Sequence, residues 1–131
     1  MPYGLISLQE ELRLFARLMN FYSKLYPQIK FTKKEKTLCA SEIGEIQYTY
    51  AGQETEDRAI DIMNEINDAL PEYSVPIVLL KKKKYFLLLD GHRRARVAWT
   101  KKMKWKALLI VPNKDAKFGV EDTIMKKIKN I

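Results

Sequence analysis

The chain has 131 residues, of which 47% are hydrophobic, and its 24 basic against 16 acidic residues give a net charge of +8 at pH 7. This length and hydrophobicity fit one folded domain with a packed core and exclude wholesale disorder. No apolar run approaches the roughly 18 residues that a membrane span needs, and the first residues do not have the pattern of a secretory signal. We therefore expect a cytoplasmic (intracellular) protein with no membrane partner.

The basic excess favours a polyanionic partner, either a nucleic acid or the phosphates of a nucleotide. Lysine enrichment is also typical of soluble proteins from hot environments, so charge alone does not separate these interpretations. Cys39 is the only cysteine, which excludes an intramolecular disulfide. One histidine and one cysteine far apart in the sequence give a zinc site little support.

Residues 7–25 have the pattern of one amphipathic helix. Ser7 and Glu10 have capping-box spacing, and apolar side chains then recur at three- and four-residue steps. A proline ends this pattern, and the basic stretch that follows is expected to be a loop. We therefore predict an N-terminal helix and basic loop over residues 1–36, packed on a domain of residues 37–131.

The rest of the chain alternates between strand and helix signals. Residues 46–50 alternate as in a strand or extended segment, and residues 55–70 predict a helix with acidic residues in its first turn. Two apolar runs around a lysine cluster predict a β-hairpin over residues 74–90. The elements expected after it are a helix over residues 91–103, a strand over residues 105–112 and an amphipathic helix from residue 120. This order predicts a compact α+β domain with a small mixed sheet flanked by helices.

The segment LLLDGHRRARVAW places a strand-to-helix turn beside anion-binding side chains. The first N–H groups of a helix have no intrahelical partners and lie at the positive end of its dipole, and Gly91 lets an anion approach them closely. Arg93 and Arg94 can each grip phosphate oxygens with a planar guanidinium group. His92 can donate a hydrogen bond or carry a charge. The turn is therefore a candidate phosphate site.

Asp90 precedes this turn, although an aspartate repels phosphate. In one interpretation its side chain caps the helix by accepting from the N–H of His92 or Arg93. In the others it is a general base for an attacking hydroxyl, or a Mg²⁺ ligand that bridges to a phosphate. His92 also has a structural alternative, as a side chain packed at the helix start and hydrogen-bonded to the backbone.

Lysine clusters offer a second kind of site. The run Lys81, Lys82, Lys83 and Lys84 is interpreted as the solvated turn of the hairpin, or else as a contact to a phosphate backbone. Lys101 and Lys102 begin a further basic stretch that can follow a nucleic acid, as can residues 33–36. Tyr48, Tyr50 and Tyr85 are candidates for stacking on bases, or else belong to the core and the strand surface.

The motif DGHRRARVAW resembles the signature segment of ParB/sulfiredoxin-like domains. Its glycine and arginines echo the Gly-Glu-Arg-Arg motif of the partition-protein branch, with His92 in place of the glutamate. Asp90, Gly91, His92 and Arg94 reproduce the Asp-Gly-His-His-Arg motif of the free serine kinase branch. The flanking hairpin and the following strand extend the resemblance over residues 37–112.

The resemblance implies a ParB/sulfiredoxin-like fold with an extra N-terminal helix. It implies that Gly91, His92, Arg93 and Arg94 bind the phosphates of a nucleotide such as CTP, ATP or ADP. Asp90 then corresponds to a catalytic aspartate and candidate Mg²⁺ ligand, and His92 and Glu54 correspond to further catalytic residues, with Glu45 as the alternative to Glu54. Sulfiredoxins need a cysteine before the motif histidine, where this chain has Gly91, so sulfinic-acid reductase activity is not expected.

The first functional hypothesis is therefore nucleotide binding at residues 90–94, with phosphoryl transfer or nucleotide hydrolysis as the reaction if the protein is an enzyme. The alternative is a DNA-binding module of ParB-like type, with nuclease activity as its reaction. Because too few residues follow the motif for a helix-turn-helix domain, we do not expect sequence-specific DNA partitioning. A third hypothesis is an interaction protein that forms a homodimer through its first helix.

Overall fold

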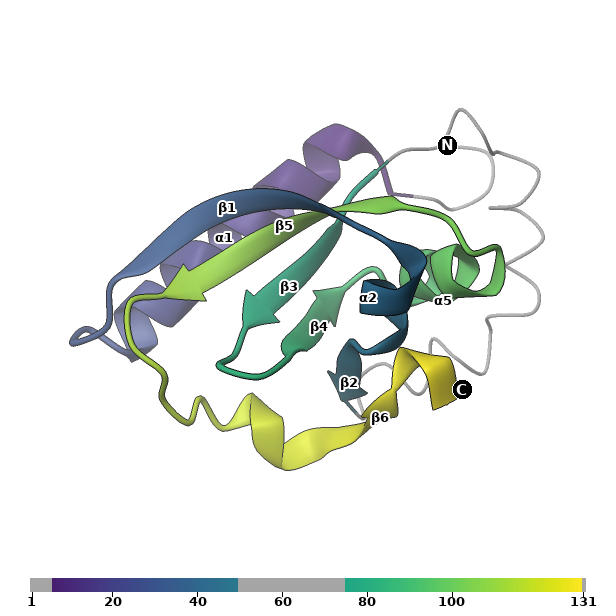
Figure 1. Ribbon diagram of the computed structural model, residues 1–131. Helices are drawn as coiled ribbons and strands as arrows, with labels where there is room; N and C mark the ends of the chain where they lie inside the picture. Colours follow the sequence, from purple (N-terminus) through teal and green to yellow (C-terminus); the bar gives the residue numbers. More distant parts are fainter. Residues whose placement is uncertain (1–5, 50–74, 131) are drawn as a thin grey trace.

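The computed structural model describes residues 6–49 and 75–130, which form a six-stranded mixed sheet with helices on both faces (Figure 1). The strands are β1 (Phe31–Leu38), β2 (Gln47–Thr49), β3 (Ile77–Lys81), β4 (Phe86–Asp90), β5 (Trp105–Pro112) and β6 (Ile124–Lys127). The helices are α1 (Leu8–Leu25), α2 (Ala40–Gly44) and α5 (His92–Thr100), with short 3-10 helices η2 (Val120–Thr123) and η3 (Ile128–Asn130). The predicted α+β class with a mixed sheet is confirmed.

The strand order is β1-β5-β3-β4-β2-β6. Strands β3 and β4 form the predicted antiparallel hairpin, β5 runs parallel to β3, and β2 runs parallel to β4. The chain enters β4 from the lysine-rich hairpin turn and leaves it at the turn into α5 (Figure 1). The two candidate sites predicted from the sequence therefore lie at opposite ends of β4.

Helix α1 forms as predicted and covers one face of the sheet. Ser7 caps it through the expected capping box with Glu10. Phe15 and Tyr22 face the sheet, where Tyr22 lies within 5.9 Å of the Phe31 ring, centroid to centroid. The part of the apolar stripe from Phe15 onward packs against the sheet, whereas Leu8 and Leu12 at its start are exposed.

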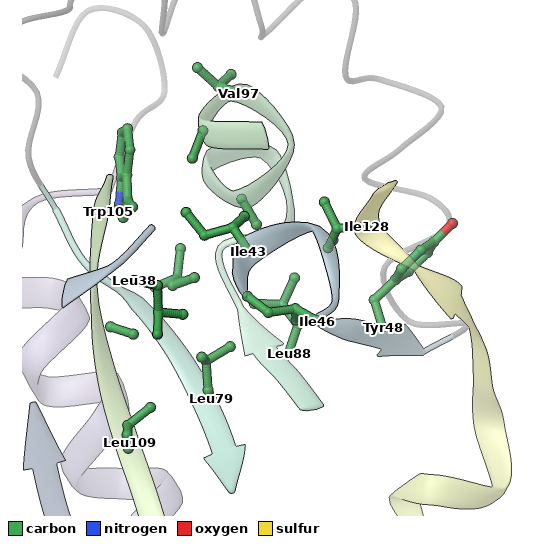
Figure 2. Packing of buried hydrophobic residues seen from close by; sticks show 14 of the residues in the cluster. Leu38, Ile43, Ile46, Tyr48, Leu79, Leu88, Val97, Trp105, Leu109 and Ile128 are labelled. Atoms are coloured by element: carbon green, nitrogen blue, oxygen red, sulfur yellow. The ribbon is translucent and has the colours of Figure 1, made fainter. Parts of the chain in front are cut away.

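The other face is covered by α2, α5 and η3 (Figure 2). Leu79 of β3 and Leu88 of β4 point to this face and are almost fully buried, as is Ile43 of α2. Both faces of the central strands are therefore inside the protein, and this explains why β3 reads as an unbroken apolar run. Among the described residues, no helix has the length and hydrophobicity needed to span a membrane.

Several expected elements are wrong. Residues 31–36 belong to β1 and not to a loop, so the boundary expected after Lys36 falls inside a strand. Six consecutive residues of β1 are exposed, because the strand lies at the sheet edge, and this removes the alternating pattern that identifies a strand. The helix expected from residue 120 is also wrong. That segment forms η2, β6 and η3, because β6 pairs with β2.

Two further differences concern element ends. Helix α5 ends at Thr100 and not near residue 103, and Lys102 adopts a positive φ of 55° just beyond it. The strand expected over residues 46–50 is described only as Gln47–Thr49, and the short helix α2 before it was not predicted. The helix expected over residues 55–70 lies outside the described residues.

Candidate functional site

Gly91 makes the turn from β4 into α5 and is the N-cap of the helix, in the left-handed region with φ 98° and ψ 32°. A Cβ at this position would lie 2.7 Å from Cγ2 of Ile77 and 2.9 Å from Nη2 of Arg94. Both the backbone conformation and the packing therefore require glycine here. The strand-to-helix turn predicted from the sequence is confirmed, with α5 beginning at His92.

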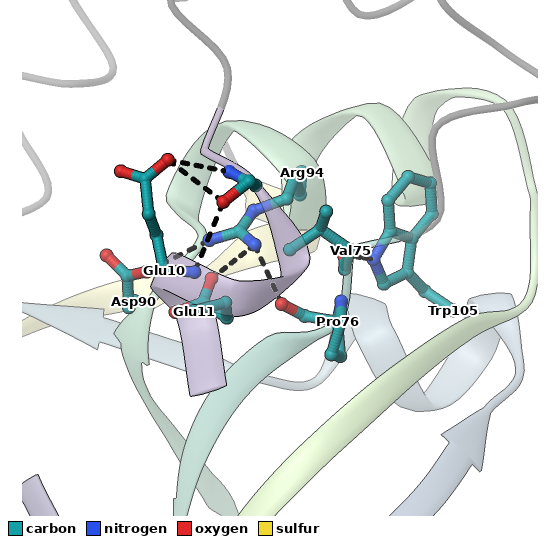
Figure 3. Close-up of polar contacts among 8 residues, drawn as sticks. Glu10, Glu11, Val75, Pro76, Asp90, Arg94 and Trp105 are labelled. Carbon is teal, nitrogen blue, oxygen red and sulfur yellow. Dashed lines mark hydrogen bonds and ion pairs between the residues drawn. The ribbon is translucent and has the colours of Figure 1, made fainter. Parts of the chain in front are cut away.

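Arg94 is turned inward, with only 5% of its surface exposed. Its Nη1 donates to the carbonyl oxygen of Pro76 at 2.7 Å, and its Nη2 donates to Oδ2 of Asp90 at 3.0 Å (Figure 3). Nη1 also forms an ion pair with Oε2 of Glu11 on α1. Because the guanidinium joins α1, the entry to β3 and the end of β4, its placement gives no support to the predicted contact with phosphate.

Glu11 of α1 also belongs to this polar cluster, and the sequence did not predict its role. Its side chain is fully buried, and although it lies against Arg94, neither of its oxygens makes a hydrogen bond of good geometry. The pKa of Glu11 is raised from 4.5 to about 8, because burial and the neighbouring Asp90 carboxyl raise it more than the charge of Arg94 lowers it. Burial and Asp90 therefore favour the protonated form of Glu11, and Arg94 favours the charged form. A glutamate within the apolar stripe of the first helix was the available signal.

Asp90 ends β4, and its side chain is 33% exposed. The hypothesis that it caps α5 is wrong, because Gly91 is the N-cap and no side chain makes the cap hydrogen bond. One carboxylate oxygen is held by Arg94, and part of the group faces solvent. Its role as a general base or a Mg²⁺ ligand stays a prediction.

His92 and Arg93, at the start of α5, have different surroundings. The His92 ring is half-buried and stands edge-on to the Tyr48 ring, with centroids 6.1 Å apart and an interplanar angle of 83°. Tyr48 is 1% exposed and belongs to the core, so it cannot stack on a base. The side chain of Arg93 is half-exposed and forms no hydrogen bond or ion pair within residues 6–49 and 75–130. Glu54 and Tyr50 lie outside the described residues.

An open groove of about 760 Å³ lies at the other end of β4. The hairpin between β3 and β4 forms one wall, and α2 with the adjoining strands forms the other (Figure 1). The groove is lined by Ser41, Glu42, Glu45, Gln47, Lys81, Lys82, Lys83, Lys84, Tyr85, Phe86 and Lys127. It therefore contains the whole lysine run that the sequence singled out.

The four lysines of the hairpin are not equivalent. The side chains of Lys81, Lys83 and Lys84 are exposed and make no hydrogen bond or ion pair with any described residue. Lys82 is 8% exposed, and its ammonium lies 3.2 Å from Asp115, 3.4 Å from Glu121 and 4.7 Å from the centroid of the Phe118 ring. The interpretation of Lys82 as a solvated or phosphate-contacting residue is therefore wrong, because alternation along the strand directs it to the α1 side of the sheet.

The opposite wall of the groove carries two carboxylates that already have cationic partners. Glu42 accepts from the ammonium of Lys36 at 3.0 Å and from the N–H of Cys39, and these hydrogen bonds lower its pKa. Glu45 accepts from Lys127 and Lys129, and these hydrogen bonds lower its pKa to about 2. The net positive charge of the groove is therefore concentrated on the hairpin wall.

Lys101 and Lys102 follow α5, at the end of the sheet where β3 and β5 begin. The ammonium of Lys102 lies 3.1 Å from the centroid of the Trp99 ring. Since the hairpin turn lies at the other end of β3, the structure does not bring these two lysines together with Lys81, Lys83 and Lys84 (Figure 1). The basic residues grouped in the DNA-binding hypothesis form two separate surfaces.

Comparison of the chain with known protein families, with curated proteins and with solved structures found no match. The resemblance to ParB/sulfiredoxin-like domains therefore stays a prediction from the motif and its flanks. Functional inference for this protein depends on the two sites described above.

Proposed function

We propose that this protein binds nucleic acid through the groove at the β3–β4 hairpin. The observation that carries the proposal is the set Lys81, Lys83 and Lys84, three exposed ammonium groups without partners among the described residues, gathered on one wall of the groove. Phosphates that pair with such lysines release condensed counterions, which is the main source of sequence-independent affinity. The net charge of +8 adds a favourable long-range field.

The arrangement of the other charges supports the same wall. Lys127 and Lys129 share the carboxylate of Glu45, and Lys82 pairs with Asp115 and Glu121. A phosphate gains little from a lysine that already has a carboxylate partner, because that ion pair must be broken first. Lys81, Lys83 and Lys84 can pair with phosphates without first breaking an ion pair.

The test is binding of a fluorescently labelled oligonucleotide, followed by anisotropy over a series of salt concentrations. We expect affinity to fall with salt and the triple variant Lys81→Ala, Lys83→Ala, Lys84→Ala to lose most of it, with a shallower salt slope. The matched control is Lys24→Ala, Lys104→Ala, Lys114→Ala, which removes the same charge from exposed lysines outside the groove. Equal losses of affinity in the two triple variants would show that binding depends only on the net charge of the protein, and they would contradict binding in the groove.

A second candidate function is nucleotide binding at the start of α5. Two observations favour it: the N-cap Gly91 contributes no capping side chain, and the half-exposed Arg93 has no partner among the described residues. In this proposal Arg93 and His92 contact phosphate, while Arg94 holds the turn in place. The half-exposed Asp90 would act as the base, or as the ligand for Mg²⁺, in phosphoryl transfer or hydrolysis.

The second function is tested by calorimetric titration with CTP, ATP and ADP, each with and without Mg²⁺. Saturable binding that is lost in Arg93→Ala and retained in Arg96→Ala would support it. A response to none of the nucleotides would assign the turn a structural role. If the protein also binds no oligonucleotide, the remaining hypothesis is an interaction protein, and a homodimer is then tested by its sedimentation at several concentrations.

A further inference from the structure

The walls of the hairpin groove differ in charge, and this orients any nucleic acid that enters it. One wall presents the ammonium groups of Lys81, Lys83 and Lys84. The other presents Glu42 and Glu45, whose carboxylates repel phosphate even though each has a lysine partner. A phosphate backbone is therefore expected along the hairpin wall, with the rest of each nucleotide directed toward α2.

Phe86 supplies an aromatic surface within the same groove. It is the first residue of β4, it is half-buried against the core that α2 and α5 cover, and part of its side chain lines the groove. The Lys36 ammonium stands 6.0 Å from the centroid of this ring. An aromatic ring at the base of a basic groove is the arrangement on which an unpaired base can stack.

From these two features we propose that the groove takes single-stranded nucleic acid, with the backbone along Lys81, Lys83 and Lys84 and a base on the ring of Phe86. This inference rests on the function proposed above and names its ligand class. In a duplex the bases are stacked on one another and paired, so none can reach Phe86 without being unpaired first. A duplex can offer only its phosphates to the hairpin wall.

The geometry of α2 agrees with a single strand. Reading a duplex through its major groove needs a helix or a two-stranded ribbon that projects from the protein. The helix at this groove, α2, spans only Ala40–Gly44, and its residues Ile43 and Gly44 are buried. It forms a wall and does not project. The β3–β4 hairpin does not form a separate ribbon either, because its strands lie between β5 and β2 in the sheet. Gln47, which also lines the groove, adds an amide that can hydrogen-bond the edge of an unpaired base.

The experiment compares one labelled strand with the blunt duplex of the same sequence and length, over the same series of salt concentrations. We expect the single strand to bind on the order of tenfold more tightly than the duplex, the contribution of one stacked base. Phe86→Leu should remove this preference and leave the salt slope of binding unchanged, since no cation is lost. Phe86→Tyr keeps an aromatic face and should retain the preference, and Phe21→Leu, at an exposed position on α1, is the matched control.

The outcomes separate the two proposals. If duplex and single strand bind equally, or if Phe86→Leu keeps the full preference in a protein with an unchanged circular dichroism spectrum, the inference is overturned and nucleic-acid binding stands. If neither form binds, or if loss of the three hairpin lysines leaves single-strand affinity unchanged, the proposed function fails and the inference fails with it. Loss of binding in both Phe86→Leu and Phe86→Tyr would also overturn the stacking role.

Discussion

Arg94 on α5 lies in direct contact with Glu11 on α1, between the first helix and the end of β4, and Glu11 is fully buried while Arg94 is 5% exposed. The pair connects residues that are remote in the sequence and, with Asp90 and the carbonyl of Pro76, uses the polar atoms of the strand-to-helix turn (Figure 3). The arginine with the most evident binding signature in the sequence thus holds α1 to the sheet.

Replacement of Arg94 tests this structural role. We expect Arg94→Ala to lower the free energy of unfolding by about 3–5 kcal/mol, because it leaves the Pro76 carbonyl and the two carboxyl groups without their shared donor. Arg93→Ala, which removes a half-exposed side chain without a described partner, should change it by about 0.5 kcal/mol or less. Urea unfolding of both variants measures the difference. Similar midpoints for the two variants would contradict the buried position of Arg94.

The stability of the protein should depend on the titration of Glu11. Its pKa is about 8 in the folded protein and 4.5 when unperturbed, so between these values the folded state binds more protons than the unfolded state. The free energy of unfolding is therefore expected to fall as the pH rises through this window and to level off above it, as far as Glu11 contributes. Glu11→Gln cannot ionise and should flatten this part of the profile. Urea unfolding from pH 5 to about pH 9 makes the measurement, and an unchanged slope in the variant would exclude Glu11 as its source.

Comparison of Gly91 with Gly119 separates the cost of backbone strain from the cost of steric overlap. Both have positive φ, 98° and 82°, but a Cβ at Gly91 meets Ile77 and Arg94, whereas a Cβ at Gly119 meets nothing within 4 Å. We expect Gly119→Ala to cost about 1 kcal/mol from backbone strain alone, and Gly91→Ala to cost at least about 2 kcal/mol because steric overlap is added. Thermal unfolding of the two variants tests the order, and a larger loss at Gly119 would contradict it.

Adjacent lysines of the hairpin should have opposite roles. Lys82→Met removes a buried ammonium from Asp115 and Glu121 and should reduce stability by about 2 kcal/mol. Lys83→Met removes an exposed one and should leave stability unchanged while weakening oligonucleotide binding. Unfolding and anisotropy measurements on both variants separate the roles. A loss of stability for Lys83→Met equal to that for Lys82→Met would show that burial does not distinguish them.

The carboxylate of Glu45 should lower the affinity of the groove for nucleic acid. Its carboxylate holds Lys127 and Lys129, and its pKa of about 2 means that it is ionised throughout the physiological range. Glu45→Gln removes a negative charge from the groove and frees two ammonium groups, so oligonucleotide affinity should rise several-fold with a steeper salt slope. Glu10→Gln, which removes an exposed carboxylate from α1, is the control. An affinity that does not change in Glu45→Gln would show that the Glu45 carboxylate does not act on phosphates bound in the groove.

Local sequence patterns predicted α1, the β3–β4 hairpin, β5 and the turn into α5, because each has its full signal within a few neighbouring residues. A capping box begins α1, apolar runs mark the strands, and Gly91 marks the turn. The strands β1 and β6 were not predicted, since an exposed edge strand lacks alternation and β6 is identified by its pairing with β2. Their signal lies in partners elsewhere in the chain.

The candidate sites divide in the same way. The α+β class, the basic charge and the residue types at the turn and the hairpin can be read from the sequence. Three features arise only in the folded chain: Arg94 is buried against Glu11, Lys82 faces inward while its neighbours face solvent, and Phe86 lines the same groove as these lysines. The physical reason is that the binding capacity of a charged side chain depends on its burial and on the partners already bound to it. Both are set by segments that are distant in sequence and meet only when the sheet is assembled.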